Sequence, residues 1–250
     1  MEALSTQHIT RSFSGKVIIE DISIRLMERE LICLLGVSGS GKTTLFNVIS
    51  GILPPDRGQV LLHGEDVTGR PGQISYMLQK DLLLEHMKVI DNVALPLRLK
   101  GAGKKEARAQ ADPLFEQFGL EGTQELYPAA LSGGMRQRAA LLRTYLGSHG
   151  VALLDEPFSA LDTITKGQIH TWYLDIMEKI DLSTIFITHD IDEAILLSDR
   201  IYIMTGSPGR IRDEIVIDHP RNDRREFNLT QEFLSYKKEV LKALKAPQVP

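Results

Sequence analysis

The pattern of apolar and polar positions predicts an α/β fold in which buried strands alternate with amphipathic helices. Four runs without interior charge have the length and composition of buried strands, and they span residues 31–35, 74–78, 151–154 and 184–188. Apolar residues recur at helical spacing after three of these runs, through residues 45–52, 169–180 and 194–197. This alternation indicates one layered α/β core.

Residues 7–26 show a different pattern, in which apolar and polar positions alternate in two short pieces. One piece lies around Ile9 and the other covers residues 17–24. Ser14 and Gly15 between them predict a turn. We therefore expect two antiparallel strands at this end of the chain.

The C-terminal part predicts a hairpin followed by a helix. The hairpin strands are expected at residues 201–204 and 211–217, and the helix runs through residues 233–244. Residues 219–226 between them are highly charged. They are expected to form a solvated connector.

Composition changes between residues 81 and 126, where the pattern predicts a mostly helical insert. Residues 101–108 are basic and predict a flexible segment, and a helix is expected to begin at Pro113 with Asp112 as its N-cap. The apolar surface of this insert either binds a partner or forms the core of a subdomain. The sequence leaves both possibilities open.

The whole-chain values narrow the range of functions. A chain of 250 residues with 42% hydrophobic residues can bury the core of one domain, and no apolar run is as long as a membrane span. The polar N-terminus lacks the apolar region of a signal peptide, so a cytosolic protein is expected. A net charge of −4 gives no support to nucleic-acid binding, and Cys33, the only cysteine, is expected to be an inert core thiol.

A glycine-rich segment lies between the first buried run and the first helix and fits the phosphate-binding pattern of Gly, four residues, Gly-Lys-Thr. Gly36, Gly39 and Gly41 let the backbone turn so that its amide N–H groups point at one anion. Lys42 can neutralise β- and γ-phosphate oxygens, and the Thr43 hydroxyl is placed to bind the Mg²⁺ of a nucleotide. A plain surface loop would have no reason to place Lys-Thr here, so the segment predicts a nucleotide site.

Polar groups at the ends of the other buried runs can complete such a site. Asp155 can face the Mg²⁺, and Glu156 can orient and deprotonate the attacking water. Gln79 can bind Mg²⁺ or sense the γ-phosphate, and His189 can meet the same phosphate. Each of these residues also has a plain interpretation as a solvated strand end or a loop residue.

Two further features bear on the nucleotide. Phe13, beside the first turn, can stack on a purine base, although a half-buried core position is an equal alternative. Ser132, Gly133 and Gly134 stand at a helix start and can form a second anion-binding terminus. Because one ATP cannot easily contact both termini within one compact subunit, we expect a two-fold dimer in which each second terminus closes over the other subunit's γ-phosphate.

Together these motifs resemble the nucleotide-binding subunits of ATP-binding-cassette (ABC) transporters, in order, from about residue 4 to residue 217. Phe13 falls at the adenine-stacking position, and Gln79 and His189 fall at the Q-loop and the H-loop. The Walker A, signature, Walker B and D-loop motifs correspond to residues 36–44, 131–137, 154–156 and 159–162. The resemblance also places Ser38, Ser40 and Thr44 among the ATP contacts.

The resemblance implies an ATPase that binds ATP and Mg²⁺ in a homodimer and drives a separate integral membrane permease, with no nucleic-acid partner. Such a subunit is cytoplasmic and lies on the inner face of the cell membrane. The implied catalytic residues are Lys42, Gln79, Glu156 and His189, and the implied Mg²⁺ ligands are Thr43, Gln79 and Asp155.

The implied fold is a P-loop NTPase (RecA-like) core with an N-terminal antiparallel β subdomain and a helical subdomain, in a single ABC ATPase domain over residues 1–250. The core takes residues 1–80 and 150–217, and the helical subdomain with the signature takes residues 81–149. Residues 218–250 form a short C-terminal helical tail.

Within the family, the region around Leu83, the turn at residues 207–211 and the short tail look like importers for nitrate, sulfonate, taurine and related solutes, including thiamine precursors. In such importers an extracellular solute-binding protein delivers the solute. The alternatives are the ATPase of an exporter and a soluble ABC ATPase without a permease. The chain departs from the group at Val37, where Pro is common, and at Thr144 and Tyr145, where small residues are usual.

Overall fold

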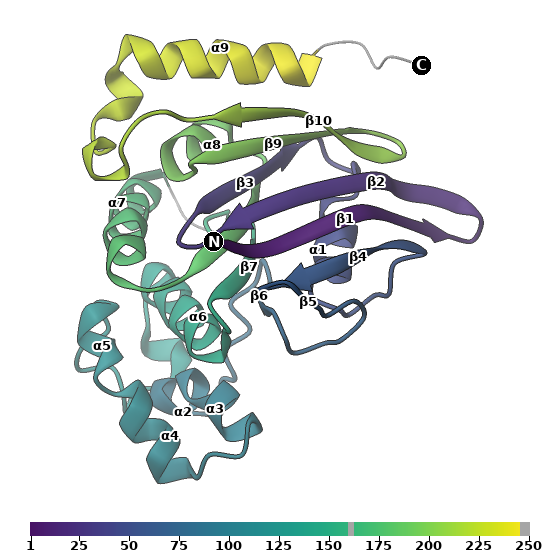
Figure 1. The fold of residues 1–250 in the computed structure, drawn as a ribbon. Coiled ribbons are helices and arrows are strands. Elements are labelled where there is room, and N and C mark those ends of the chain that lie inside the picture. The colour runs from purple at the N-terminus through teal and green to yellow at the C-terminus, as the bar shows by residue number, and fades with distance from the viewer. Residues whose placement is uncertain (160–162, 246–250) are drawn as a thin grey trace.

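The computed structural model describes residues 1–159 and 163–245, and its described strands form one ten-stranded sheet (Figure 1). The strand order across the sheet is β5-β4-β1-β2-β10-β9-β3-β8-β7-β6. The strands are β1 (Glu2–Phe13), β2 (Lys16–Met27), β3 (Leu31–Gly36), β4 (Arg57–Leu62), β5 (Glu65–Asp66), β6 (Ser75–Met77), β7 (Val151–Asp155), β8 (Ser183–Thr188), β9 (Arg200–Gly206) and β10 (Gly209–Val216).

One half of the sheet is parallel and contains all four uncharged runs, which confirms that they are strands. β3 pairs in parallel with β8 and β9, and β7 pairs in parallel with β8 and β6. Leu31, Cys33 and Leu35 of β3 face one hydrophobic core, while Ile32 and Leu34 face the other. Because these parallel strands end at one edge, the segments after β3, β6, β7 and β8 meet there.

The other half of the sheet is mostly antiparallel, as the alternating N-terminal pattern predicts, apart from the parallel pairing of β10 with β2. β1 and β2 pair with each other through several register shifts, and each strand has 12 residues, longer than expected. Ser5 and Thr6 are buried in β1, and they interrupt the apolar pattern near its start. The Thr6 hydroxyl accepts a hydrogen bond from the Ile24 amide at 2.9 Å, which satisfies this buried oxygen.

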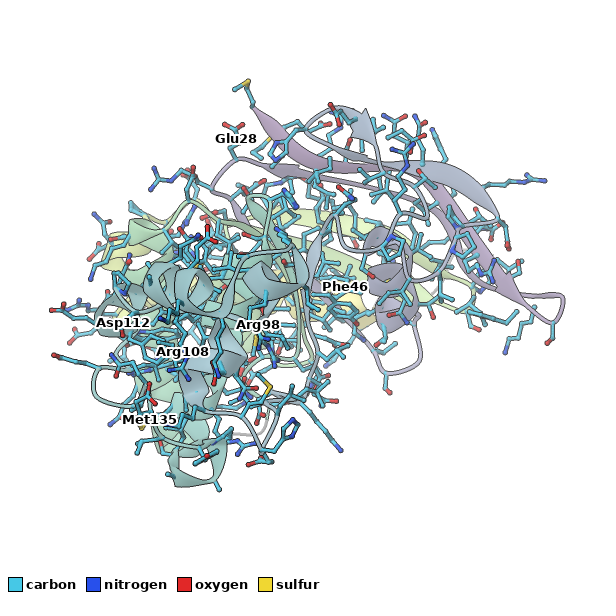
Figure 2. All side chains as sticks on the ribbon, turned by 90° about the horizontal axis from the view of Figure 1, so that it is seen from below. Glu28, Phe46, Arg98, Arg108, Asp112 and Met135 are labelled. Carbon is cyan, nitrogen blue, oxygen red and sulfur yellow. The ribbon has the colours of Figure 1, made fainter. Side chains whose placement is uncertain are left out.

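The helices fall into separate groups in Figure 1. The group from α2 to α6 lies below the sheet, beyond β6 and β7, whereas α9 lies beside β10. Seen from below in Figure 2, Arg108, Asp112 and Met135 gather with the lower group, apart from Phe46 of α1. The helices are α1 (Lys42–Ile49), α2 (Val89–Val93), α3 (Leu95–Leu99), α4 (Lys104–Ala111), α5 (Leu114–Gln117), α6 (Gly133–Gly147), α7 (Thr163–Lys179), α8 (Ile191–Leu197) and α9 (Gln231–Lys245), with short 3₁₀ helices at Pro128–Ala130, Arg221–Asp223 and Phe227–Leu229.

The prediction of a flexible segment over residues 101–108 is wrong, because most of it belongs to α4. Ala107 and Ala111, four residues apart, are fully buried on one face of this helix. Asp112 has helical φ and ψ of −55° and −46° and ends α4, so it does not cap the next helix. The residue at the N-cap position of α5 is Pro113.

The predicted connector over residues 219–226 is solvent-exposed at most of its positions, as expected, and Arg224 is the exception. Arg224 is 1% exposed, and its guanidinium donates at 2.7 Å to the carbonyl oxygens of both Ser198 and His219. The His219 ring stacks on Phe227 with centroids 3.9 Å apart. Through the hydrogen bonds of Arg224, this segment therefore attaches the C-terminal part of the chain to the core. Cys33 is a buried free thiol whose pKa is raised by burial, which fits the expected inert role.

Candidate active site

The glycine-rich segment follows β3 directly and leads into α1 at Lys42. Gly39 and Gly41 have φ of 82° and 94°, in the left-handed region that favours glycine. Gly36 has no room for a side chain, because a Cβ there would lie 2.2 Å from the Met204 carbonyl oxygen. Among the described side chains, none caps the N-terminus of α1. The N–H groups of this helix end can therefore bind an anion.

The Lys42 ammonium lies over the loop that it follows. Its Nζ donates to the carbonyl oxygens of Gly36 at 2.9 Å and Val37 at 3.0 Å. Burial lowers the pKa of Lys42, and the carboxylates of Glu156 and Asp155 oppose this shift. The ammonium is thus held at the loop, near two acidic groups.

A pocket of about 460 Å³ lies over this loop and is shared by the ends of β7 and β8. Ile18 of β2 and Ile187 of β8 add apolar walls. Two predicted ATP contacts of the loop segment, Gly36 and Ser40, do not line this pocket. The predicted residues that line the pocket are Ser38, Gly39, Gly41, Lys42, Thr43, Thr44, Asp155, Glu156 and His189.

Asp155 stands at the end of β7 with its carboxylate against Tyr76 of β6. Tyr76 Oη donates to Asp155 Oδ2 at 3.3 Å. Burial raises the pKa of Asp155, while the hydrogen bond from Tyr76, the charge of Lys42 and the Thr43 hydroxyl act in the opposite direction. The Asp155 carboxylate and the Thr43 hydroxyl therefore face each other beside the phosphate loop.

Glu156 follows in an uncommon backbone conformation. Its φ is 46°, in the left-handed region that a residue with a side chain rarely adopts. The Glu156 N–H donates to the Ile187 carbonyl oxygen at 3.0 Å, so the link to β8 continues past the strand end. Strain of this kind, of order 1 to 3 kcal/mol, is typical of functional sites.

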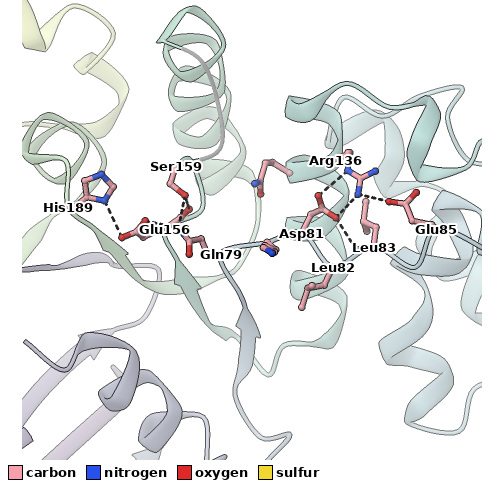
Figure 3. Close-up of a pocket in the computed structure, with 11 residues that line it drawn as sticks. Gln79, Asp81, Leu82, Leu83, Glu85, Arg136, Glu156, Ser159 and His189 are labelled. Atoms are coloured by element: carbon pink, nitrogen blue, oxygen red, sulfur yellow. Dashed lines mark hydrogen bonds and ion pairs between the residues drawn. The ribbon is translucent and has the colours of Figure 1, made fainter. Parts of the chain in front are cut away.

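The Glu156 carboxylate is engaged on both oxygens (Figure 3). Gln79 Nε2 donates to Oε2 at 3.0 Å, and His189 Nδ1 lies 3.1 Å from Oε1. Gln79 Nε2 also lies 3.3 Å from Ser159 Oγ, which itself donates to the Glu156 carbonyl oxygen. Three segments that are distant in sequence therefore meet at one carboxylate.

A second pocket of about 760 Å³ lies on the far side of Gln79. Glu156 and His189 line both pockets and so form their common wall. At the other end of the second pocket, Arg136 of α6 forms two hydrogen bonds of 3.0 Å with Asp81 (Figure 3). Gln79 thus lines this second pocket and contacts the pocket over the phosphate loop through Glu156.

The remaining predicted residues lie outside both pockets. Phe13 is 41% exposed at the end of β1, where the Arg11 guanidinium lies 5.0 Å from its ring centroid. Ser132 caps α6 by accepting the Met135 N–H, and neither pocket includes residues 132–134. Of the predicted D-loop, Ser159 is described above, and residues 160–162 lie outside the described residues.

The contact between Tyr76 and Asp155 was not predicted from the sequence, nor were the two isoleucine walls. Tyr76 lies three residues before Gln79, in a run whose pattern predicts only a strand. It reaches Asp155 because β6 pairs in parallel with β7. If the strand order were known, the contact could be predicted, because Tyr76 lies in the strand next to the one that ends at Asp155.

These residues fit a magnesium nucleotide. Ser40 Oγ is buried beside the loop and has no hydrogen-bond partner among the described residues. The uncapped helix end and Lys42 offer donors for phosphate oxygens. The oxygens of Thr43 and Asp155 are the kind of ligand that Mg²⁺ prefers.

The fold and the site define a P-loop ATPase, in which a phosphate-binding loop lies beside a strand that ends in two carboxylates. The family model "ABC transporter" matches residues 19–159, more than half of the chain. The chain belongs to the ABC transporter family, and it is an ATP-binding subunit that hydrolyses ATP.

Three similar proteins cover most of the chain. It is 41% identical to the formylaminopyrimidine import ATP-binding protein ThiZ of Halalkalibacterium halodurans, over 98% of this chain and 96% of that protein. It is 37% identical to the aliphatic sulfonates import ATP-binding protein SsuB 2 of Burkholderia cenocepacia, over 87% and 79%. It is 35% identical to the nitrate import ATP-binding protein NrtD of a Synechocystis species, over 97% and 95%.

Solved structures of ABC cassettes have the same fold. A nucleotide-free cassette from an ABC transporter superposes with a TM-score of 0.79 at 21% identity, over 99% of this chain and all of that one. A dimeric cassette bound to ADP and Pi has a TM-score of 0.71 at 25% identity, over 87% of this chain and all of that one. Within residues 1–159 and 163–245, none of the helices combines the length and the apolar composition that a membrane span requires.

Proposed function

We propose that this chain energises the uptake of a small solute through a separate membrane permease. The observation that carries the ATPase part of the proposal is the meeting of Lys42, Asp155, Glu156 and His189 at one pocket, and the similar proteins carry the part about uptake. The similar proteins named above import formylaminopyrimidine, aliphatic sulfonates and nitrate. The proposed solute is accordingly a small nutrient of the thiamine-precursor, sulfonate, taurine or nitrate type.

In the proposed site, the loop amides and Lys42 bind the phosphates of ATP. Phe13 stacks on the adenine, from its exposed position at the end of β1. Thr43, Gln79 and Asp155 would hold Mg²⁺, which when bound neutralises charge on the phosphate oxygens. The other proposed phosphate contacts are Gly36, Ser38, Gly39, Ser40, Gly41 and Thr44.

Glu156 is the proposed general base, which orients the attacking water and accepts its proton. His189, which lines the same pocket, contacts the γ-phosphate. Gln79 donates to Glu156 Oε2 in this structure, and the second lone pair of that oxygen is left to accept from water.

A second copy of the chain completes the site in this proposal. Ser132, Gly133 and Gly134 stand outside the nucleotide pocket of their own subunit. In a two-fold homodimer these residues reach the ATP of the other subunit. The dimer binds the permease at the inner face of the cell membrane, and an extracellular solute-binding protein acts on the permease from outside.

The proposed division of the chain follows the same scheme. Residues 1–80 and 150–217 form the nucleotide-binding core, and residues 81–149 form the helical subdomain that carries the signature. Residues 218–250 form the tail.

The test is to tag the chain in its native host, isolate it from membranes in mild detergent and identify its partners by mass. Recovery of a multi-span permease and a solute-binding protein supports the proposal, and that binding protein can then be titrated with aminopyrimidine, alkyl sulfonate, taurine and nitrate. Uptake of the bound solute must fall in cells that carry only Glu156→Gln. A permease without a binding protein, together with unchanged uptake, would indicate an exporter, and only soluble partners would exclude a transporter.

A further inference from the structure

The ring of His189 is poorly held by its own contacts. Its side chain is 65% exposed, and its Nδ1 touches the Glu156 carboxylate. With few contacts on the ring itself, the backbone of residues 188–190 decides where the Cα–Cβ bond points and which rotamers the ring can adopt. The contacts of the residues on either side of His189 therefore decide where the ring points.

One buried hydroxyl joins these two neighbours. Thr188 is 2% exposed, and its Oγ1 donates to Glu193 Oε2 at 2.6 Å. The same oxygen accepts the Asp190 N–H at 3.0 Å, across His189. Since the single hydroxyl proton is used on Glu193, the lone pair that faces Asp190 is fixed as well.

The Glu193 carboxylate is in turn fixed by α7. Its Oε1 accepts a hydrogen bond from Lys166 Nζ at 2.9 Å, and His170 Nε2 lies 3.4 Å from the same oxygen. Glu193 is 4% exposed, and burial alone would raise its pKa. The contacts with His170, Thr188 and Lys166 outweigh burial and lower the pKa to about 2. The acceptor for Thr188 is therefore a charged carboxylate at neutral pH.

We propose that Thr188, Glu193 and Lys166 form a positioning network that sets the direction of the His189 ring. None of the three lines the nucleotide pocket. They act through the backbone of residues 188–190 and connect α7 and α8 to the histidine. This inference rests on the role proposed above for His189, and it adds the residues on which that role depends.

The test compares Thr188→Val, which removes the hydroxyl at nearly constant volume, with Thr188→Ser, which keeps it. ATP turnover is measured on the full chain. We expect Thr188→Val to lower kcat about tenfold, as expected for the loss of one hydrogen bond to a charged group, with KM for MgATP within about twofold. Thr188→Ser should keep kcat within about twofold of the parent protein.

The decisive comparison is made in a His189→Ala background. If Thr188 acts through the histidine, Thr188→Val lowers kcat no further in that background, because the side chain that Thr188 positions is absent. A full tenfold loss in that background would overturn the proposal and leave a general structural role. Full turnover in His189→Ala alone would instead remove the proposed role of His189, so the two failures are distinguishable.

A second measurement does not depend on turnover or on a single variant. In ¹⁵N-histidine NMR of the full chain, Thr188→Val and Lys166→Met should both shift the His189 ring resonances, which are assigned by their loss in His189→Ala. Lys166→Arg keeps the charge and should leave them in place. Unchanged His189 resonances in a folded Lys166→Met or Thr188→Val protein would refute the network.

Discussion

Glu156 Oε1 accepts a hydrogen bond from His189 Nδ1 across 3.1 Å, while Gln79 holds the other carboxylate oxygen. Because a carboxylate can only accept, the proton of this pair belongs to Nδ1. In a neutral ring, Nε2 is then left as an acceptor. The pair places a carboxylate and a histidine on the common wall of the two pockets.

Replacing Glu156 by Gln should lower ATP turnover by at least about a hundredfold, because an amide cannot accept the proton of the attacking water. Binding of ATP should persist, since the phosphate loop is untouched. The variant should accumulate as an ATP-bound dimer, measured by sedimentation alongside turnover. Asp181→Asn, an exposed acid outside both pockets, is the matched control. Wild-type turnover in Glu156→Gln would refute its role as the base.

Lys42→Ala should act earlier, at binding. The ammonium is a charged donor held at the loop, and its loss should weaken nucleotide affinity by about 10- to 100-fold. Titration with a fluorescent ATP analogue measures this effect, with exposed Lys238→Ala on α9 as the control for a simple loss of charge. Equal affinity in both variants would mean that the loop binds phosphate without Lys42.

The sequence predicts the phosphate loop and the carboxylates well because their signals are local. An apolar run, its polar end and the following helix are contiguous, and parallel pairing then brings Asp155 and His189 to the same edge as Lys42. The contact of Tyr76 with Asp155 depends on which strands are neighbours, which no local pattern contains.

Burial of charged residues is the other feature that sequence patterns miss. Arg224 lies in a run of charged residues that looks solvated, yet four backbone carbonyl oxygens, those of Leu196, Ser198, Ile217 and His219, accept from its guanidinium. A charge is tolerated inside a protein when such acceptors are arranged around it, and those acceptors come from segments that folding brings together. The contacts of Glu193 cannot be predicted from the sequence for the same reason, because its partners Lys166 and Thr188 lie on other elements.

Tyr145, one of the departures from the family pattern, is expected to stabilise the helical group. Its ring packs on Phe118 with centroids 5.9 Å apart, and Phe118 meets Trp172 of α7 at 6.1 Å. Tyr145→Ala should lower the free energy of unfolding by about 2 kcal/mol through lost burial and ring contact. Tyr145→Phe keeps the ring and should change it by less than about 0.5 kcal/mol. Urea unfolding measures both values, and equal stability of the two variants would show that the ring contact contributes nothing.

Glu193 should make the protein acid-sensitive in a defined range. Its pKa is about 2 when folded and near 4.5 when unfolded, so its stabilising effect is present above about pH 4.5 and is lost as the pH falls toward 2. In Glu193→Gln this contribution is absent at every pH.

The stability difference between the parent protein and Glu193→Gln should therefore shrink by about 2 kcal/mol from about pH 5 to about pH 3. Urea unfolding across the window, with exposed Glu121→Gln as the control, gives the difference. A difference that stays constant with pH would mean that Glu193 titrates in the folded protein as it does in the unfolded chain, and that the contacts with Lys166 and Thr188 do not favour its charged form.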